Sequence, residues 1–310
     1  MLEYFRTHQG VCPYRMKELY AHCGISKQGH YGALQRIEAW QQKEELMVRL
    51  MLQIREIHPG MGLRTMYEFY APEGIGRDAF ISVGLRYGFR IKAFRNEVRT
   101  TFSSPYYRYP NLVGDVVVRG INQLWTSDLT YFRIGDRFAY IVFIMDVYSR
   151  LIVGYWVAQH MRAENNLKAL KRAFRKRKTT TFTHQLIHHS DCGGQYVSDL
   201  YTKALTRAKI RISMCQLVYE NAHVERVNGT IKNQYLMHWN ITTFPQLQKQ
   251  LKRAVEAYNQ QKPHGALNKM TPHAFEHSIN QMEEKDRPEM RIWTENTTEQ
   301  ANPNQCIIPF

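Results

Sequence analysis

In the first part of the chain, apolar residues recur at the three- and four-residue spacing of amphipathic helices. This pattern predicts helices over 16–22, 27–34, 38–58, 63–70 and 77–87. In the third of these, the helical spacing is carried by Leu46, Leu50, Ile54 and Ile57. Ser26 is a candidate N-cap for the second helix, and Pro59-Gly60 ends the third. Tight turns between short helices indicate helix-turn-helix-like units, although any small helical hairpin gives the same pattern.

From Leu124 onwards the pattern changes to short runs rich in apolar, β-branched and aromatic residues. The predicted strands are 124–134, 138–147, 151–158, 185–190 and 210–214. The predicted helices are 162–177, 198–209, 221–239 and 244–260. Gly135-Asp136 and Ser149-Arg150 mark turns between the first three strands. Three strands followed by alternating helices and strands predict an α/β fold, with helices on both faces of a mixed five-stranded sheet.

Composition suggests four parts along the chain. The helical region spans 1–95, and the sheet-forming region spans 122–278. Between them, 96–121 interleaves basic and aromatic residues. An extended segment of this kind can follow a DNA backbone, and ordinary linker packing is the alternative. The end of the chain, 279–310, turns polar and is expected to be a loose tail.

The chain is strongly basic, with 42 Lys and Arg against 27 Asp and Glu and a formal charge of +15. A protein this basic usually binds a polyanion, of which nucleic acid is the common example. In the helical region, Arg64 and Arg77 are candidate DNA contacts. A solvated basic surface without a nucleic-acid role is the alternative.

The sequence shows no feature of a secreted or membrane protein. Charged residues interrupt positions 1–10, and no apolar run approaches the roughly 20 residues of a membrane span. Five scattered cysteines without a C-x-x-C pair favour reduced thiols in a cytoplasm. Adjacent His188 and His189 would point to opposite faces of a strand, which does not suit one metal. Most of the 13 histidines are expected at the surface or facing DNA.

Three acidic residues stand where a carboxylate would have a chemical use. Asp128 interrupts an apolar and aromatic strand, where a carboxylate is costly unless it is paired or binds a metal. Asp191 ends a predicted strand before a glycine pair, a position where open sheets bind ligands. Glu225 lies early in a helix and shares a face with Asn228 and Lys232. Each acid alone could instead be an N-cap, a salt bridge or a surface charge.

These acids suit phosphodiester chemistry, because hard divalent cations bound by carboxylates can activate an attacking oxygen and stabilise a leaving one. Asp146, which ends the second strand, competes for the same role. Its place just before Ser149 favours a turn-capping role instead.

Several segments resemble the OrfB transposases of bacterial insertion sequences, which share a catalytic core with retroviral integrases. The matching segments are 125–131, 146–154, 189–196, 221–233 and 258–275. The resemblance implies a ribonuclease-H-like fold and a DDE-type polynucleotidyl transferase. It implies that Asp128, Asp191 and Glu225 form the catalytic triad and hold two Mg²⁺ ions, with Mn²⁺ able to substitute. It also implies that Lys232 contacts the transposon-end DNA, and Asn228 on the same face is a further candidate.

Such enzymes nick the end of the element to leave a 3′-hydroxyl, which then attacks another phosphodiester without a covalent protein–DNA intermediate. The expected partners are double-stranded DNA, as transposon ends and target, and further copies of the chain assembled on that DNA. Two-frame relatives often join a small upstream protein to the catalytic part. This chain lacks a sustained heptad run, so we expect it to be the downstream half, with an OrfA-type protein as partner or fusion.

Two departures from the family pattern stand out. Between Asp191 and Glu225 there are 33 residues, two fewer than in most of these relatives, and the shortening falls at 215–219. Lys262 stands where the family commonly has arginine, which keeps the charge but loses the bidentate fork. Two alternative functions remain, a nuclease of the same fold without strand transfer and a catalytically inactive DNA-binding regulator. The basic helical region and the matching C-terminal segment favour the transposase over the nuclease, and the acidic triad argues against the inactive regulator.

Overall fold

The computed structural model describes residues 2–8, 10, 13–92, 94, 109–114, 116–182, 185–215 and 221–292. The chain divides into two compact units, the first of residues 1–56 and 62–90 and the second of residues 57–61 and 91–310. Much of the predicted linker, 96–108, and the predicted tail from 293 lie outside the described residues. Each unit is therefore described by itself.

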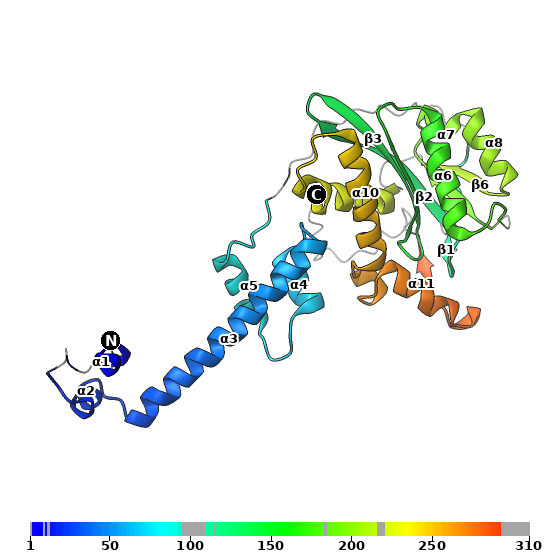
Figure 1. The fold of residues 1–310 in the computed structure, drawn as a ribbon. Helices are drawn as coiled ribbons and strands as arrows, with labels where there is room; N and C mark the ends of the chain where they lie inside the picture. Colours follow the sequence, from blue (N-terminus) through cyan, green and yellow to red (C-terminus); the bar gives the residue numbers. More distant parts are fainter. Residues whose placement is uncertain are drawn as a thin grey trace, which may run out of the picture. The chain divides into compact units, whose positions relative to one another are not determined.

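The first unit is helical (Figure 1). Its helices are α1 (Leu2–Thr7), α2 (Met16–His22), α3 (Lys27–Ile57), α4 (Leu63–Tyr70) and α5 (Arg77–Arg86). The prediction of separate helices over 27–34 and 38–58 is wrong, because no Gly or Pro between Leu34 and Glu38 interrupts α3. The predicted N-cap is confirmed, since the Ser26 hydroxyl accepts a hydrogen bond of 2.9 Å from the backbone N–H of Gly29.

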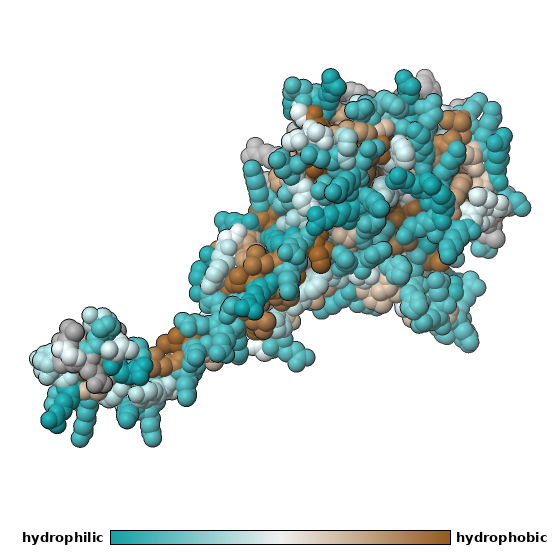
Figure 2. Space-filling model, viewed as in Figure 1, coloured by the Kyte–Doolittle hydropathy of each residue, from teal (hydrophilic) through white to brown (hydrophobic). Residues whose placement is uncertain are grey.

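The core of this unit lies on a stripe of α3 that differs from the predicted spacing. Met47, Met51 and Ile54 are buried, whereas Leu46 is 54% exposed. Met66 of α4 and Phe80 and Val83 of α5 complete the buried set. Other apolar side chains of α3 remain exposed and show as brown patches along the helix in Figure 2.

The second unit is built on a five-stranded sheet in the order β4-β3-β2-β5-β6, which confirms the predicted mixed sheet. Its strands are β2 (Leu124–Ile134), β3 (Arg137–Asp146), β4 (Ile152–Ala158), β5 (Ile187–Ser190) and β6 (Arg211–Met214). β2, β3 and β4 pair antiparallel, whereas β5 runs parallel to β2 and β6 runs parallel to β5. Gly135, at a φ of 57°, makes the tight turn between β2 and β3. The sheet therefore places β2 at its centre.

Helices cover both faces of this sheet (Figure 1). One face is covered by α6 (Ala163–Arg177), α7 (Gly194–Val197) and α8 (Asp199–Arg207), and the other by α9 (Ala222–Gln234), α10 (Phe244–Gln260) and α11 (Pro272–Asn280). Side chains of β3 alternate between the two cores, Phe143 entering one and Val142 and Ile144 the other. Glycine at 154 lets α6 approach β4, since a Cβ there would lie 2.4 Å from the carbonyl oxygen of Ala169.

The remaining elements are short. β1 (Val117–Val118) pairs antiparallel with β7 (Met290–Arg291). Three 3₁₀ helices complete the described part of the second unit, η2 (Leu236–His238), η3 (Gly265–Leu267) and η4 (Glu284–Asp286). The helix predicted over 221–239 ends at Gln234, because Tyr235 leaves the helical conformation with a φ of −127°. No helix in the described part of the chain combines the length and apolar character needed to cross a membrane.

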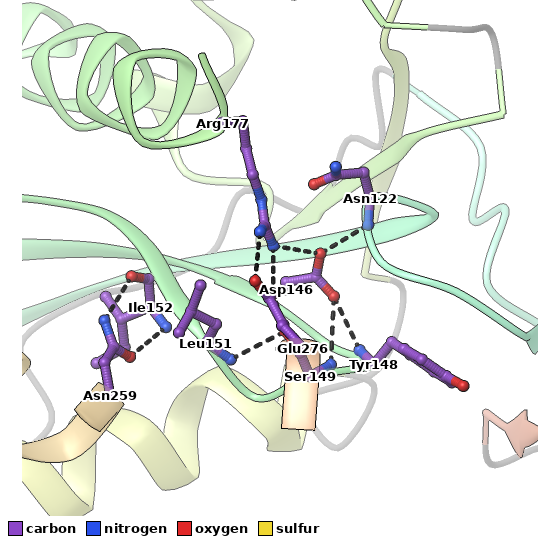
Figure 3. Close-up of polar contacts among 9 residues, drawn as sticks. All are labelled: Asn122, Asp146, Tyr148, Ser149, Leu151, Ile152, Arg177, Asn259 and Glu276. Carbon is purple, nitrogen blue, oxygen red and sulfur yellow. Dashed lines mark hydrogen bonds and ion pairs between the residues drawn. The ribbon is translucent and has the colours of Figure 1, made fainter. Parts of the chain in front are cut away.

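A buried ionic network holds α6 and α11 to the end of β3 (Figure 3). The Arg177 guanidinium donates to Asp146 at 2.9 Å and, through both terminal nitrogens, to Glu276 at 2.7 Å. Asp146 also accepts hydrogen bonds from the backbone N–H groups of Tyr148 and Ser149, at 3.1 and 3.4 Å, which confirms its turn-capping role. Asp146 is therefore committed to structure and is removed from the candidates for metal binding.

Replacing Arg177 with methionine would leave two buried carboxylates without their cation. We expect the free energy of unfolding to fall by about 3–5 kcal/mol, because breaking one side of a buried pair strands the other charge. Urea denaturation would measure it. The matched control is Lys252→Met, which removes an exposed lysine 3.9 Å from Glu256 and should cost about 0.5 kcal/mol or less. Equal destabilisation of the two variants would contradict a structural role for Arg177.

Candidate active site

Parallel pairing of β2 and β5 places two of the predicted acids side by side. Ser127 pairs with Ser190 in the sheet, and Asp128 and Asp191 are the next residues on the two strands. Asp128 lies within β2, opposite Phe143 of β3, whereas Asp191 follows the end of β5 directly. The two carboxylates thus belong to neighbouring strands at one level of the sheet.

Helix α9 is fastened to this same part of β2 by two asparagine side chains. The Asn221 amide donates to the carbonyl oxygen of Ser127 at 3.1 Å, and the Asn228 amide donates to Asp128 Oδ2 at 2.7 Å. Glu225 lies four residues after Asn221 and three before Asn228, so it shares their helical face. The third predicted acid is therefore on the helical face that bonds to Ser127 and Asp128 within β2.

The carboxylates interact strongly through their charges. The pKa of Asp128 is raised to about 7, first by burial, then by the negative charge of Asp191 and, more weakly, by that of Glu225. Hydrogen bonds from the Leu129 backbone and the Asn228 amide act in the opposite direction. Burial also raises the pKa of Asp191, against a hydrogen bond of 3.1 Å from the Gly193 backbone N–H. A cation beside this pair would relieve the repulsion.

The donor set fits a hard cation, because carboxylate oxygens are the ligands that Mg²⁺ prefers. The side chain of Glu225 is exposed, while Asp128 and Asp191 are half-buried. Among the residues that the structure describes, no three His, Cys, Asp or Glu side chains stand close enough together to hold a metal. The geometry thus gives a coupled pair of aspartates with the glutamate on the facing helix, rather than a closed cage of three acids.

The aspartate pair is supported by a tyrosine whose role the sequence did not reveal. Tyr196 of α7 is buried, and its hydroxyl lies 2.8 Å from the Ser127 hydroxyl, next to Asp128. Its pKa is raised well above the usual value by burial first and then by the charges of Asp191 and Asp128. The neutral phenol therefore packs beneath the acids without adding a charge. The turn after Asp191 is also tight, since a Cβ on Gly193 would lie 3.0 Å from Asp191 Oδ1.

The expectation that histidines lie at the surface is wrong for the adjacent pair on β5. His188 and His189 are both buried and bond to different partners, His188 to the Tyr201 hydroxyl at 2.9 Å and His189 to the Ser213 hydroxyl at 2.8 Å. Burial lowers the pKa of His188 to about 3 and that of His189 to about 4. Both are therefore neutral core groups, which face opposite sides of the strand as predicted.

The predicted DNA contacts lie in three different places. Arg64 and Arg77 are exposed in the first unit and pair with neighbouring acids, Glu68 at 3.3 Å and Asp78 at 3.0 Å. Lys232 lies on α9, with its ammonium group 4.7 Å from the centre of the Tyr131 ring. The amide of Asn228 is used on Asp128, so this residue acts on the carboxylate directly.

Comparison with known proteins now adds to the geometry. Residues 119–218 and 208–272 each match a family described as integrase core domain. The uncharacterized 31 kDa protein of insertion element IS600 from Shigella sonnei is 30% identical over 268 residues, covering 84% of this chain and 97% of that protein. The transposase for insertion sequence element IS629, also from Shigella sonnei, is 30% identical over 246 residues, covering 75% and 79%.

Among solved structures, the HTLV-2 integrase catalytic core domain in complex with magnesium aligns with a TM-score of 0.40 at 19% identity. That alignment covers 50% of this chain and 96% of the other. The mixed sheet and the matched residues define the second unit as an integrase-type core of a DNA-recombining enzyme. The chain belongs to the transposases of bacterial insertion sequences that carry this core.

The raised pKa of Asp128 makes stability depend on pH in a defined direction. The acid stays protonated in the folded protein until about pH 7, whereas the unfolded chain ionises near 3.8. The contribution of Asp128 to stability therefore falls as pH rises through this window, and an asparagine at 128 does not titrate. The quantity compared is the free energy of unfolding of Asp128→Asn minus that of wild type, both without metal. We expect this difference to be larger at pH 8 than at pH 4 by roughly 1–4 kcal/mol.

Urea titrations at both pH values in EDTA would measure this difference. The matched control is Asp136→Asn, in the exposed hairpin turn, which should follow wild type at both pH values. A variant at 128 that also follows wild type would show that the carboxylate is not strained by its neighbours.

Proposed function

We propose that Asp128, Asp191 and Glu225 are the catalytic carboxylates of this transposase and that together they hold two Mg²⁺ ions, with Mn²⁺ able to substitute. The observation that carries the proposal is that Asp128 and Asp191 follow Ser127 and Ser190, which pair on adjacent parallel strands, so that the charge of Asp191 disfavours ionisation of Asp128. Such a pair is costly in a protein unless it has a use for positive charge. The exposed Glu225 on the facing helix supplies a third oxygen ligand.

The proposed reaction joins DNA in two displacements. First, a water oxygen bonds to phosphorus at the end of the element as it gives up a proton, the P–O3′ bond breaks, and the departing oxygen takes a proton to become a 3′-hydroxyl. Next, this oxygen bonds to phosphorus in the target as its proton leaves, the P–O3′ bond of the target breaks, and the departing target oxygen takes a proton to become a 3′-hydroxyl. Bound divalent cations supply charge neutralisation at the attacking and leaving oxygens.

The residues of the chain orient the carboxylates for this chemistry. The Asn228 amide fixes one oxygen of Asp128, and the Gly193 N–H fixes one oxygen of Asp191. Both carboxylates are thereby held at defined angles on a rigid sheet, which catalytic geometry requires. Lys232, two turns along α9 from Glu225, is the proposed contact to transposon-end DNA. Arg64, Arg77 and Asn228 remain candidate DNA contacts.

Substitution of the acids should separate chemistry from binding. We expect Asp128→Asn, Asp191→Asn and Glu225→Gln each to reduce end cleavage and strand transfer by at least about 1000-fold, because the three act as a unit. DNA binding in Ca²⁺ should remain close to wild type. The measurement uses labelled duplex ends and target plasmid, with separate gels for cleavage and for joined product.

Two further variants make the experiment specific. Asp136→Asn, an exposed acid in the hairpin turn, should leave both steps intact. Lys232→Ala should show the reverse of the acid variants, because it loses DNA binding and not the chemistry. Its binding should be weaker, and the log–log slope of affinity against salt should fall by about one unit. Full cleavage by Asp128→Asn would remove that residue from the site. Cleaved ends without any joined product from wild type would favour the nuclease alternative.

The active assembly that we propose contains double-stranded DNA, as element ends and target, and more than one copy of this chain. A protein from an upstream frame, of OrfA type, is proposed as a further partner or fusion. A transposition assay with and without the upstream frame supplied tests this. We expect transposition to require it, and undiminished transposition without it would contradict the partnership.

A further inference from the structure

A second charged cluster lies on a different side of α9 from the proposed catalytic acids. Its centre is Arg150, in the turn between β3 and β4 at a φ of 61°. His223 and Arg226 stand on α9, rotated by at least about 100° from Glu225 at 100° per residue. Around them are Tyr258 of α10 and the segment after it, which carries Lys262 and His264.

The contacts around Arg150 contain no negative partner among the described residues. One terminal nitrogen of the guanidinium lies 2.5 Å from His223 Nδ1, and the other lies 3.6 Å from the sulfur of Met290. The rings of Tyr258 and His264 meet edge to face with centroids 4.8 Å apart. In the same part of the chain, ion pairs engage Arg177 but none engages Arg150, Arg226 or Lys262.

His264 responds to this excess of positive charge. The pKa of His264 is lowered to about 3 by burial and then by Lys262 and Arg150. The positive charges of Lys262 and Arg150 therefore both reach His264.

The carboxylate of Asp146, which acts on Arg150, is already in use. Burial has the largest effect on Arg150 and lowers its pKa. The negative charge of Asp146 has a smaller effect in the opposite direction. Its own oxygens, however, accept hydrogen bonds from Arg177 and from the backbone N–H of Asn122, at 2.9 and 2.7 Å (Figure 3). It cannot also neutralise Arg226 and Lys262. Within the described protein, no carboxylate thus forms a direct ion pair with this cluster.

One buried ring nitrogen also lacks a partner here. His264 Nε2 is buried and makes no hydrogen bond with the described residues. A tetrahedral oxyanion accepts several hydrogen bonds and carries negative charge, so it suits this set of groups. The set comprises the half-buried Arg150 and Lys262, the exposed Arg226, and the imidazoles of His223 and His264. Exposed Arg226 leaves the cluster open toward solvent.

We propose that Arg150, His223, Arg226, Lys262 and His264 form a phosphate-binding site, separate from the catalytic carboxylates. Resting on the proposed function, its occupant is a backbone phosphate of the DNA that the enzyme joins. Such a contact would hold the duplex at two places around α9. The catalytic acids lie on one side of the helix, and the phosphate-binding site lies on another. The departure from arginine to lysine at 262 changes one member of this site.

The first experiment measures inorganic phosphate binding in the full chain carrying Asp128→Asn, so that no catalytic step is needed. Phosphate should raise the melting temperature above that in chloride of equal ionic strength and shift the ring resonances of His223 and His264 in selectively labelled protein. Arg226→Gln with Lys262→Gln should abolish both effects. Arg226→Lys with Lys262→Arg, which keeps the charges, should retain them and so excludes misfolding as the cause.

The second experiment measures duplex DNA affinity against salt concentration with the same proteins. We expect the double glutamine variant to reduce the log–log slope by about 0.9 for each DNA phosphate that its side chains no longer bind. Lys252→Gln, an exposed cation on α10, serves as the matched control for both experiments and should behave as wild type. Disappearance of the phosphate effects with an unchanged DNA slope would overturn the DNA assignment and leave a site for free phosphate.

Phosphate effects that survive in the double glutamine variant, or that are absent from the parent protein, would overturn the site itself. Neither result depends on cleavage or joining. Failure of the proposed catalytic triad would appear instead as activity retained by the Asp128, Asp191 and Glu225 variants. The two proposals therefore fail in different assays.

Discussion

The repulsion between Asp128 and Asp191 is the interaction around which the second unit is arranged. Burying two carboxylates at one level of adjacent parallel strands costs free energy, so such pairs are uncommon in protein cores. Here the strands are fixed by backbone pairing at Ser127 and Ser190, so neither acid can move away from the other. The surrounding groups, Asn228, Gly193 and the neutral Tyr196, hold the acids in place without cancelling their charge. The cost is acceptable where a cation completes the site.

The C-terminal part of the chain supports this arrangement from a distance. Arg177 joins Asp146 at the end of β3 to Glu276 on α11, and Asn259 of α10 bonds to both the N–H and the C=O of Ile152 at 2.9 and 3.0 Å. Because β3 pairs with β2, these bonds fix the strand that carries Asp128. Asn259 and Glu276 therefore help to fix the shape of the core.

The sequence predicted the elements of the sheet well, because each strand is a compact apolar run closed by a turn such as Gly135-Asp136. The order of the strands and the adjacency of Asp128 and Asp191 needed the fold, since no local pattern encodes a parallel pairing between 127 and 190. The continuity of α3 was missed because short helical patterns were divided where no residue breaks them. The burial of His188 and His189 was missed because their partners, Tyr201 and Ser213, are distant in sequence.

The central position of β2 has a consequence for how the protein is made. As the chain leaves the ribosome, β2, β3 and β4 emerge first, and β5 follows only after the whole of α6. Until then one edge of β2 has unpaired backbone groups, which can pair with another chain. A product truncated before residue 187 would therefore carry Asp128 on an open sheet edge and would be prone to aggregate.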